Sequence, residues 1–240
     1  YTERLIESLE LIDRDNQYII FLRRENFEEY QPVAPNFTKV LADYAWYGFS
    51  EQFFFPIQLL FHRLDIVHFP HFNIPIVYPK RFVVTIHDLI LLRYPTLRST
   101  TKIAWWYWIK FAVYRVVIWI ACRRAYRVIV VSRFTEEDVL KTFPFLLKKL
   151  RVTIEGVSRY CFVSTNKDAR AVLGRFGLIG DTNVQQEKRQ IHDILQPYFL
   201  YVGNAYPHKN LERICSLAMH FPEYRFVLVG REDFFYQRLK

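Results

Sequence analysis

Residues 82–88 read Phe-Val-Val-Thr-Ile-His-Asp, a continuous apolar run that ends in a histidine and an aspartate. A strand that is apolar on both faces is typical of a parallel sheet covered by helices on both sides. Residues 128–131 repeat the pattern and are followed by Ser132 and Arg133. The two stretches therefore predict an α/β fold built on parallel strands.

Further short apolar runs predict the remaining strands. We expect strands at 18–22, 66–69, 82–86, 128–131, 152–154, 199–202 and 226–229. Helical periodicity falls between them at 3–12, 51–62, 102–125, 136–143 and 210–221. Because strand and helix alternate along nearly the whole chain, we expect doubly wound, Rossmann-like sheets.

The alternation breaks once, between Arg159 and Gln196, where the composition turns polar. A short helix at 167–176 and a surface loop would account for this segment. We therefore expect an N-terminal domain over residues 1–157 and a linker over 158–196. The start of a second domain is expected over 197–240.

The composition describes a globular chain with an anionic partner. About half of the 240 residues are hydrophobic (51%), and the formal net charge is +9. Nucleic acid, a phosphorylated substrate and anionic lipid would all suit that charge. Three widely spaced cysteines indicate neither a disulfide framework nor a paired metal site, and they favour a reducing cytosol.

The stretch at 103–121 is rich in tryptophan but is interrupted by two cations. Spanning a membrane takes about 20 mostly apolar residues, and each central Lys or Arg costs about 2.5 to 3.5 kcal/mol. We expect instead a long, largely buried helix whose basic edge continues into Arg123, Arg124 and Arg127. Such an edge is compatible with an anionic membrane surface.

Polar residues follow the predicted strands at the edge where parallel sheets bind ligands. His87 beside Asp88 is suited to proton transfer or to a hydrogen bond with a substrate hydroxyl, although a structural histidine is the alternative. Thr135 and Asp138 have the spacing of a capping box, which would leave Ser132 and Arg133 free to face a cleft.

His68 and His71 also lie beside this edge, but no further cluster of metal ligands accompanies them in the sequence. We therefore expect no metal site there.

The second βα unit carries a glycine and a lysine in suggestive places. Gly203 ends a predicted strand, and Gly230 ends the next one. Lys209 stands at a predicted helix N-terminus, where a cation opposes the helix dipole and a phosphate would be stabilised. A solvated lysine is the simpler alternative. The chain contains neither a P-loop nor a G-x-G-x-x-G motif.

Together these segments resemble the retaining, nucleotide-sugar-dependent glycosyltransferases of family 4 (group 1), which have the two-domain GT-B fold. The resemblance is carried, in the family's order, by the stretches 65–70, 83–89, 128–135, 152–157, 201–210 and 226–231. It is closest to mannosyltransferase-like members that build surface polysaccharides. It implies a nucleoside diphosphate sugar as donor and a glycan or lipid-linked acceptor, without nucleic acid or an obligatory metal.

The resemblance also assigns roles to residues. His87, with Asp88, matches the cleft position near the transferred sugar, and Lys209 matches a contact to the donor diphosphate. Gly156 matches a glycine between the domains, and Glu155 stands before it where the family usually has Asn. The other substrate-binding positions implied are Ser132, Arg133, Gly203, Asn204 and Gly230.

Two family features do not occur in the sequence: the glycine-rich loop of the first strand and the acidic Glu-x7-Glu segment. We therefore expect a chain truncated at both ends that is inactive by itself. Two alternatives stay open, a nucleotide-sugar epimerase of the same architecture and a non-catalytic module at the membrane periphery.

Overall fold

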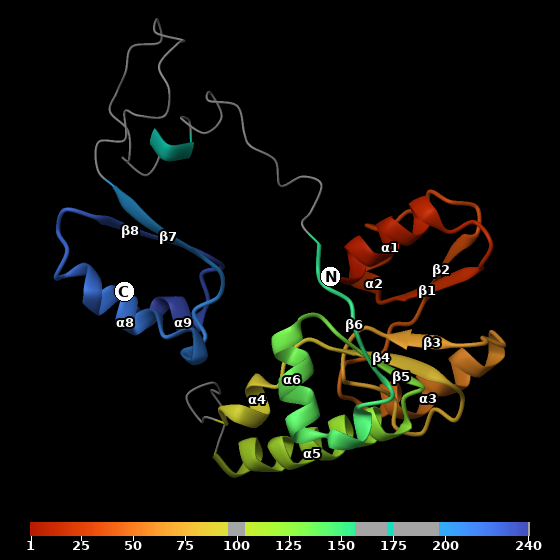
Figure 1. The fold of residues 1–240 in the computed structure, drawn as a ribbon. Coiled ribbons are helices and arrows are strands. Elements are labelled where there is room, and N and C mark those ends of the chain that lie inside the picture. Colours follow the sequence, from red (N-terminus) through yellow and green to blue (C-terminus); the bar gives the residue numbers. More distant parts are fainter. Residues whose placement is uncertain (96–103, 157–171, 175–196, 240) are drawn as a thin grey trace, which may run out of the picture. The chain divides into compact units, whose positions relative to one another are not determined.

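The computed structural model describes residues 1–95, 104–156, 172–174 and 197–239. Those up to 156 form one compact unit, unit 1, and those from 172 onward form another, unit 2 (Figure 1). The short helix expected at 167–176 lies almost wholly outside the described residues, although 172–174 are helical.

Unit 1 alternates helices with short parallel strands. In chain order its elements are α1 (Thr2–Ile12), β1 (Tyr18–Leu22), α2 (Arg24–Phe27), β2 (Phe37–Leu41), α3 (Phe49–Phe61), β3 (Val67–Phe69), β4 (Phe82–Ile86), α4 (Ile90–Arg93), α5 (Ala104–Arg124), β5 (Arg127–Val130), α6 (Arg133–Thr142), a 3-10 turn (Pro144–Leu146) and β6 (Leu150–Val152). The predicted α/β class is confirmed.

The strands of unit 1 form two parallel sheets. One is the pair β1-β2, and the other has the order β3-β4-β5-β6. In the larger sheet Phe69 lies opposite Val84, and Ile86 lies opposite Val130. Since all four strands run the same way, their carboxyl ends meet at one edge of the sheet. The segments that leave this edge are the ones expected to carry chemistry.

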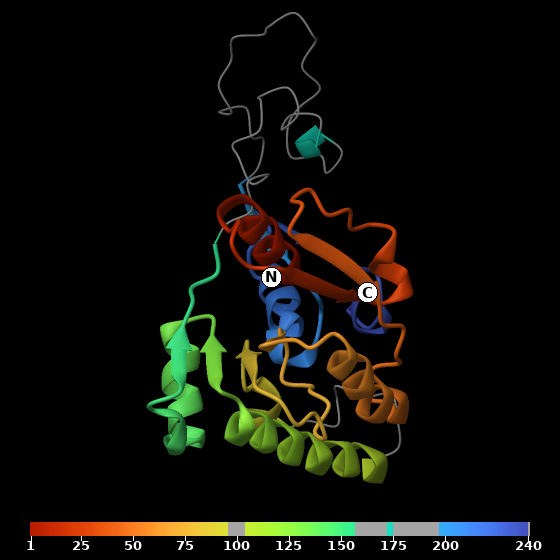
Figure 2. The ribbon, with the colours of Figure 1, turned by 90° about the vertical axis from the view of Figure 1, so that its right-hand side faces the viewer.

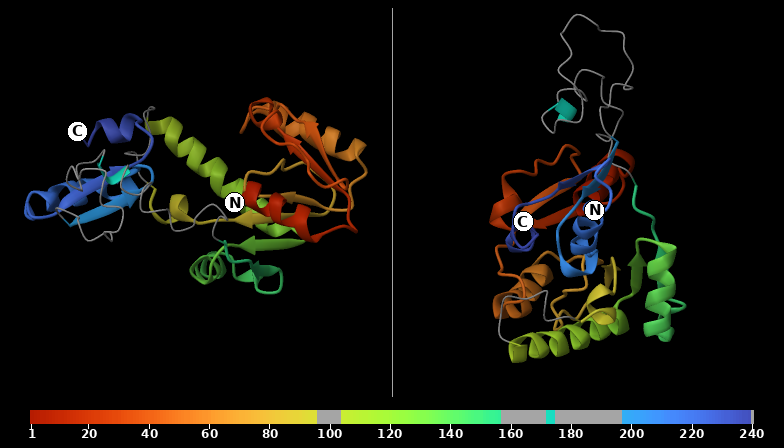
Figure 3. Two further views of the ribbon diagram at one scale, coloured as in Figure 1. Left: turned by 90° about the horizontal axis from the view of Figure 1, so that it is seen from above. Right: turned by 90° about the vertical axis from the view of Figure 1, so that its left-hand side faces the viewer.

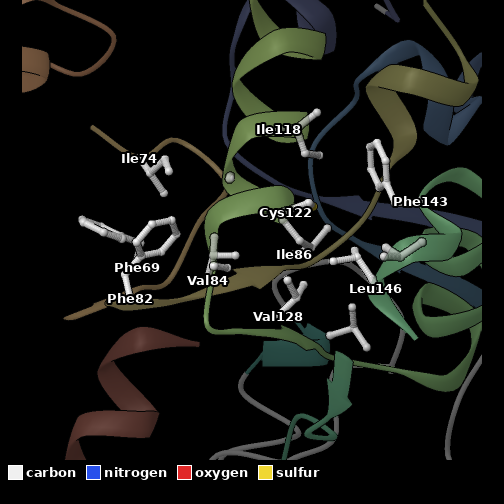
Figure 4. Packing of buried hydrophobic residues seen from close by; sticks show 14 of the residues in the cluster. Phe69, Ile74, Phe82, Val84, Ile86, Ile118, Cys122, Val128, Phe143 and Leu146 are labelled. Carbon is white, nitrogen blue, oxygen red and sulfur yellow. The ribbon is translucent and has the colours of Figure 1, made fainter. Parts of the chain in front are cut away.

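The core of unit 1 lies between the four-stranded sheet and the helices beside it (Figure 4). Val84 and Val128 on neighbouring strands are completely buried, as are Ile118 and Cys122 of α5. On the other side of the strand, Thr85 is completely buried too. The continuous apolar run of β4 is thus explained by cover on both faces, as expected for a parallel strand.

Burial also shapes Cys122, whose thiol pKa rises to about 12 because desolvation disfavours the thiolate. The thiol therefore acts as a small apolar group in the core and stays protonated over the whole neutral range.

Some predicted boundaries are wrong. The sequence indicated no element between 23 and 50, yet β2 pairs with β1 there. The last strand of unit 1 ends at Val152, whereas it was expected to begin there. Helix α6 starts at Arg133, three residues earlier than expected, because Ser132 caps it.

Unit 2 contains the parallel pair β7 (Tyr198–Val202) and β8 (Arg225–Val229). A 3-10 turn (Pro207–Lys209) and helix α8 (Leu211–Ala218) connect them, and α9 (Phe234–Gln237) follows (Figure 3). Within the described part of unit 2, Ala205 and Leu211 are the buried apolar residues. This unit therefore has a much thinner core than unit 1.

Candidate active site

Four segments of unit 1 converge at the carboxyl edge of the larger sheet. Pro70 directly follows β3, His87 directly follows β4, and Ser132 comes just after β5. Glu155 lies three residues beyond the end of β6. The parallel arrangement therefore brings together side chains that are up to 85 positions apart in the sequence, counting from Pro70 to Glu155.

His87 is the centre of this group. Its Nε2 lies 3.0 Å from the carbonyl oxygen of Pro70, and its Nδ1 lies 3.3 Å from Oε1 of Glu155. A carbonyl oxygen can only accept, so this contact is a hydrogen bond when Nε2 carries a proton. When Nδ1 is protonated as well, the ring forms an ion pair with Glu155. The imidazole is thus oriented from both sides.

A hydroxyl pair lies next to this histidine. Thr85 lies two residues before His87. Its Oγ1 is 2.8 Å from Nε2 of His68 and 3.4 Å from the Tyr1 hydroxyl. The Tyr1 ring meets the His87 ring edge to face, with centroids 4.9 Å apart. The edge therefore presents a connected set of hydroxyl and imidazole groups.

The histidines at this edge influence one another electrostatically. The pKa of His68 is lowered mainly by desolvation and further by the charge of nearby His87. Part of the His68 side chain remains exposed to solvent. The same two causes lower the pKa of His71, and Asp88 partly opposes them. Both side chains are therefore held toward the neutral form, in which imidazole can accept as well as donate hydrogen bonds.

Asp88 has a local role in the chain. Its Oδ1 accepts a hydrogen bond of 2.9 Å from the backbone N–H of Ile90, where the short helix α4 begins. The carboxylate is exposed. Its position beside His87 is thus held by the turn, and its charge acts on the site from the surface.

Ser132 is the N-cap of α6, so the predicted capping box at Thr135 and Asp138 is wrong. Ser132 has extended backbone angles, and its Oγ accepts a 3.1 Å hydrogen bond from the N–H of Thr135. Thr135 is buried and donates its hydroxyl to the carbonyl oxygen of His87 at 3.1 Å. The strand therefore passes into the helix at once, and the cap also fixes the His87 backbone.

Arg133 and Gly156 lie at the rim. Arg133 is the first residue of α6, is largely exposed, and pairs with Glu136 one turn later at 3.1 Å. A side chain at Gly156 would meet no atom within 4 Å, so packing does not demand a glycine there. Both positions remain accessible to a ligand.

In unit 2, two glycines lie at the carboxyl ends of neighbouring strands. A Cβ on Gly230 would fall 2.1 Å from the carbonyl oxygen of Gly203, so no other residue fits there. Gly203 has a positive φ of 154°, which favours glycine. The hydroxyl of Tyr236 donates to the same Gly203 oxygen at 2.8 Å. The loop after β7 is therefore held close to the loop after β8.

Asn204 and Lys209 occupy the connection that follows. The Tyr201 hydroxyl donates to the Asn204 carbonyl at 2.7 Å, which fixes the backbone of that loop. Lys209 is exposed and closes a 3-10 turn, and Asn210 in left-handed conformation separates it from α8. The helix thus begins one residue later than predicted, with Lys209 just ahead of its N-terminus.

Tyr1, Thr85, Glu155 and Tyr236 belong to these groups although sequence reasoning assigned them no site role. Thr85 had a usable signal, because residues two apart on a strand share a face with His87. Tyr1 and Tyr236 reach the sites only through tertiary packing, for which the sequence carries no local signal. Among the described residues, no group of three potential metal ligands forms.

The segment that contains this edge defines the class of protein. Residues 7–158 match the family profile described as Glycosyltransferase Family 4. The match covers more than half of the chain, so the chain belongs to this glycosyltransferase family.

A curated relative is consistent with that assignment. The chain is similar to the O-antigen chain mannosyltransferase RfbU of Salmonella typhimurium, with 22% identity over 199 residues. The aligned part covers 82% of this chain and 45% of the relative. The chain therefore spans less than half the length of this relative.

Proposed function

We propose that the protein transfers a sugar from a nucleoside diphosphate donor to a glycan or lipid-linked acceptor, with retention of configuration, in surface polysaccharide biosynthesis. The observation that carries the proposal is His87 at the carboxyl edge of β4, oriented by Pro70 and inside the segment that matches the family. Mannose is the sugar we favour, because the similar Salmonella protein is a mannosyltransferase.

His87 would contact the transferred sugar. Both ring nitrogens already face oxygen atoms, so a sugar hydroxyl must take the place of one partner. The Pro70 contact is the shorter and is made by backbone, whereas Glu155 is half exposed and lies at 3.3 Å. Glu155 is therefore the partner that would move aside, which leaves Nδ1 to accept from or donate to the hydroxyl.

Unit 2 would hold the donor diphosphate. The close approach of Gly203 and Gly230 leaves a strand edge without side chains at these two positions, so backbone N–H groups can come near a ligand. The side chain of Asn210 does not cap α8, and Lys209 lies just ahead of that helix end. We infer that Lys209 and the helix dipole together offset the phosphate charge, without an obligatory metal ion.

Within this proposal the two units belong to the two Rossmann-like domains of a GT-B enzyme, and Ser132, Arg133 and Gly156 line the rim of the sugar site in unit 1. Asp88 would support His87 through its charge. Asn204 would line the donor loop through its backbone, which Tyr201 holds in place.

The test is a transfer assay on the intact protein with a panel of nucleoside diphosphate sugars and a lipid-linked glycan acceptor. Replacing His87 with Ala should lower kcat by about 10- to 100-fold, the loss of one or two hydrogen bonds to a charged or developing group, with little change in donor affinity. Lys209→Ala should instead weaken nucleoside diphosphate binding by about tenfold. Lys141→Ala, on the outside of α6, is the matched control and should change neither.

Wild-type transfer rates in both site variants would refute the site assignment. Conversion of the donor sugar in the absence of any acceptor would refute transfer itself and point to an epimerase.

A further inference from the structure

Helix α5 exposes an apolar face although its opposite side belongs to the core. Ile118, Ala121 and Cys122 point inward and are completely buried. Six apolar residues at helical spacing remain between 46% and 59% exposed, namely Trp105, Trp108, Ile109, Val113, Val116 and Trp119. We call these six the tryptophan face. In Figures 1 and 2, α5 runs along the outside of unit 1 with the four-stranded sheet on its inner side.

The same helix is strongly basic. Its 21 residues include Lys110, Arg115, Arg123 and Arg124 and no aspartate or glutamate. Arg115 and Arg123 are exposed, and each lies four residues or fewer from an exposed member of the tryptophan face. An exposed apolar stripe of this length marks an interaction surface rather than ordinary solvent-facing helix.

Not all of the arginines contribute. Arg124 is engaged by the chain itself, because it donates to the carbonyl oxygens of Ile76 and Tyr78 and so ties α5 to the loop before β4. Arg127 lies beyond the end of α5, as the first residue of β5, and over the ring of Tyr126 at 4.7 Å. The expectation of a largely buried helix whose basic edge continues into Arg123, Arg124 and Arg127 is therefore corrected. Arg123 lies over the ring of Phe145 at 5.6 Å but stays exposed, so Arg115 and Arg123 are the arginines of α5 that accompany the tryptophan face.

A cavity of about 690 Å³ opens beside this face, between α4, α5 and α6. Leu92, Phe111 and Phe143 give it an apolar lining, and Val116 and Trp119 lie on the side of the tryptophan face. Arg115 is also part of the lining, whereas Arg93 is paired with Asp138. The cavity thus combines apolar walls with a cation in its lining, an arrangement suited to a hydrocarbon chain attached to an anionic group.

We propose that the tryptophan face of α5 docks on the surface of a membrane that contains anionic phospholipid. Tryptophan prefers the boundary between headgroups and acyl chains, and each Lys or Arg near an anionic surface strengthens attachment. A second copy of the chain is a poor partner, because two helices with four cations and no acid would repel each other. The proposal is independent of which sugar, if any, the protein transfers.

In this arrangement the helix lies in the interface plane. No helix among the described residues is long and apolar enough to cross a membrane. The indole rings would enter the headgroup region while Arg115 and Arg123 pair with lipid phosphates, and an acyl chain could enter the cavity beside Trp119.

The experiment measures sedimentation of the whole protein with phosphatidylcholine vesicles, with and without phosphatidylglycerol. Binding should require phosphatidylglycerol and weaken as salt is raised. The double variant Trp108→Ser/Trp119→Ser should bind at least about tenfold more weakly, because two large apolar side chains no longer enter the interface. Arg115→Glu should have an effect of similar size, since it changes the charge near the surface by two.

Two controls separate the tryptophan face from general stickiness and charge. Phe49→Ser/Phe54→Ser removes two aromatic rings that are more exposed than the tryptophans from α3, a helix whose single charged residue is Glu51. Lys141→Glu makes the same charge change on α6. Both should bind vesicles like the wild type, and far-ultraviolet circular dichroism should show that every variant is folded.

Three outcomes would overturn the proposal. The first is equal binding to vesicles with and without phosphatidylglycerol, and the second is equal weakening by the α3 control. The third is wild-type protein that stays off vesicles but forms dimers in sedimentation velocity that the tryptophan variant abolishes.

Discussion

The most constrained side chain at the sheet edge is the imidazole of His87, because an oxygen atom faces each of its ring nitrogens. The Pro70 carbonyl and the Glu155 carboxylate can only accept hydrogen bonds. The carboxylate repels the lone pair of a bare Nδ1 and attracts a protonated Nδ1. The neutral ring consequently has a preferred tautomer, and the charged ring has a preferred partner. A change in the contact with Pro70 or with Glu155 therefore alters which ring nitrogen can hydrogen-bond a substrate hydroxyl.

We predict that the neutral His87 ring carries its proton on Nε2. One net hydrogen bond of about 1 kcal/mol to Pro70 favours this tautomer by about fivefold. Long-range ¹H–¹⁵N correlation spectra at alkaline pH would assign the protonated nitrogen, with His87→Gln identifying the signal. Glu155→Gln should increase the share of this tautomer, because it removes the carboxylate that competes for the proton at Nδ1 and an amide N–H can donate to the bare nitrogen. A ring protonated mainly on Nδ1 would contradict the hydrogen-bond assignment.

A second prediction concerns acid stability. The pKa values of His68 and His71 lie below the ordinary 6.5 in the folded chain. Below about pH 6.5 the unfolded chain binds protons that the folded chain does not, so the free energy of unfolding should fall on acidification. All five tryptophans precede residue 120, so their fluorescence in urea reports on unit 1.

The variant His68→Gln/His71→Gln is the test of that slope. It should show a smaller loss of stability between pH 6.5 and pH 5 than the wild type, and the same pH dependence above pH 7.5, where the neutral forms prevail in both states. An unchanged slope in acid would mean that other groups dominate.

Single positions differ in how well sequence predicts their surroundings. His87 was found because a polar residue that ends a buried strand stands out. Glu155 follows the predicted strand at 152–154 and departs from the resembling family, but neither feature predicts that it provides the ring with its second partner. Tyr1 joins the site across 84 positions, through a contact that no local pattern encodes.

At the scale of elements, α6 shows how a cap connects local structure to the site. Ser132 satisfies the N–H of Thr135, and Thr135 in turn holds the His87 carbonyl. Replacing Ser132 with Ala should lower the free energy of unfolding of unit 1 by about 1 kcal/mol, measured by urea titration of tryptophan fluorescence. Ser132→Asp should recover most of the loss, and Arg133→Ala on the exposed side should cost under about 0.5 kcal/mol. Equal stability of Ser132→Ala and wild type would show that the cap contributes nothing.

Elements with continuous apolar runs were predicted well, and those with mixed patterns were not. The bounds of β1 and β4 agree with the expectation. β2 was missed because Thr38 and Lys39 break its apolar run, and Lys39 is satisfied by carbonyl oxygens of Phe27 and Tyr30 that sequence could not place. The predicted start of α6 is wrong because Ser132 and Thr135 are both residue types that favour the N-cap. Strand β5 ends at Val130, so the chain turns into the helix already at Ser132.

At the scale of the whole molecule, burial is distributed very unevenly. Unit 1 holds a continuous core around Val84, Val128 and Ile118. In the described part of unit 2, strand β7 leaves Leu200 58% and Val202 70% exposed. Because local stability follows buried apolar contacts, the two units should differ in how readily their backbone hydrogen bonds open.

Hydrogen–deuterium exchange read by mass spectrometry can test this difference. We predict that the amides of β4 and β5 exchange at least about tenfold more slowly than those of β7 and β8, since an opening that costs 1.4 kcal/mol more is ten times rarer. Ile118→Ala should cost about 2 to 5 kcal/mol within unit 1 and speed exchange in β4 and β5. Val113→Ala, on the exposed side of the same helix, is the control and should change little.

If Ile118→Ala accelerated exchange equally in β7 and β8, the chain would open as one cooperative body and the division of stability between the units would be wrong. If Ile118→Ala accelerated exchange in unit 1 alone, the two units would open independently. The faster exchange of β7 and β8 would then follow from the thin core of unit 2.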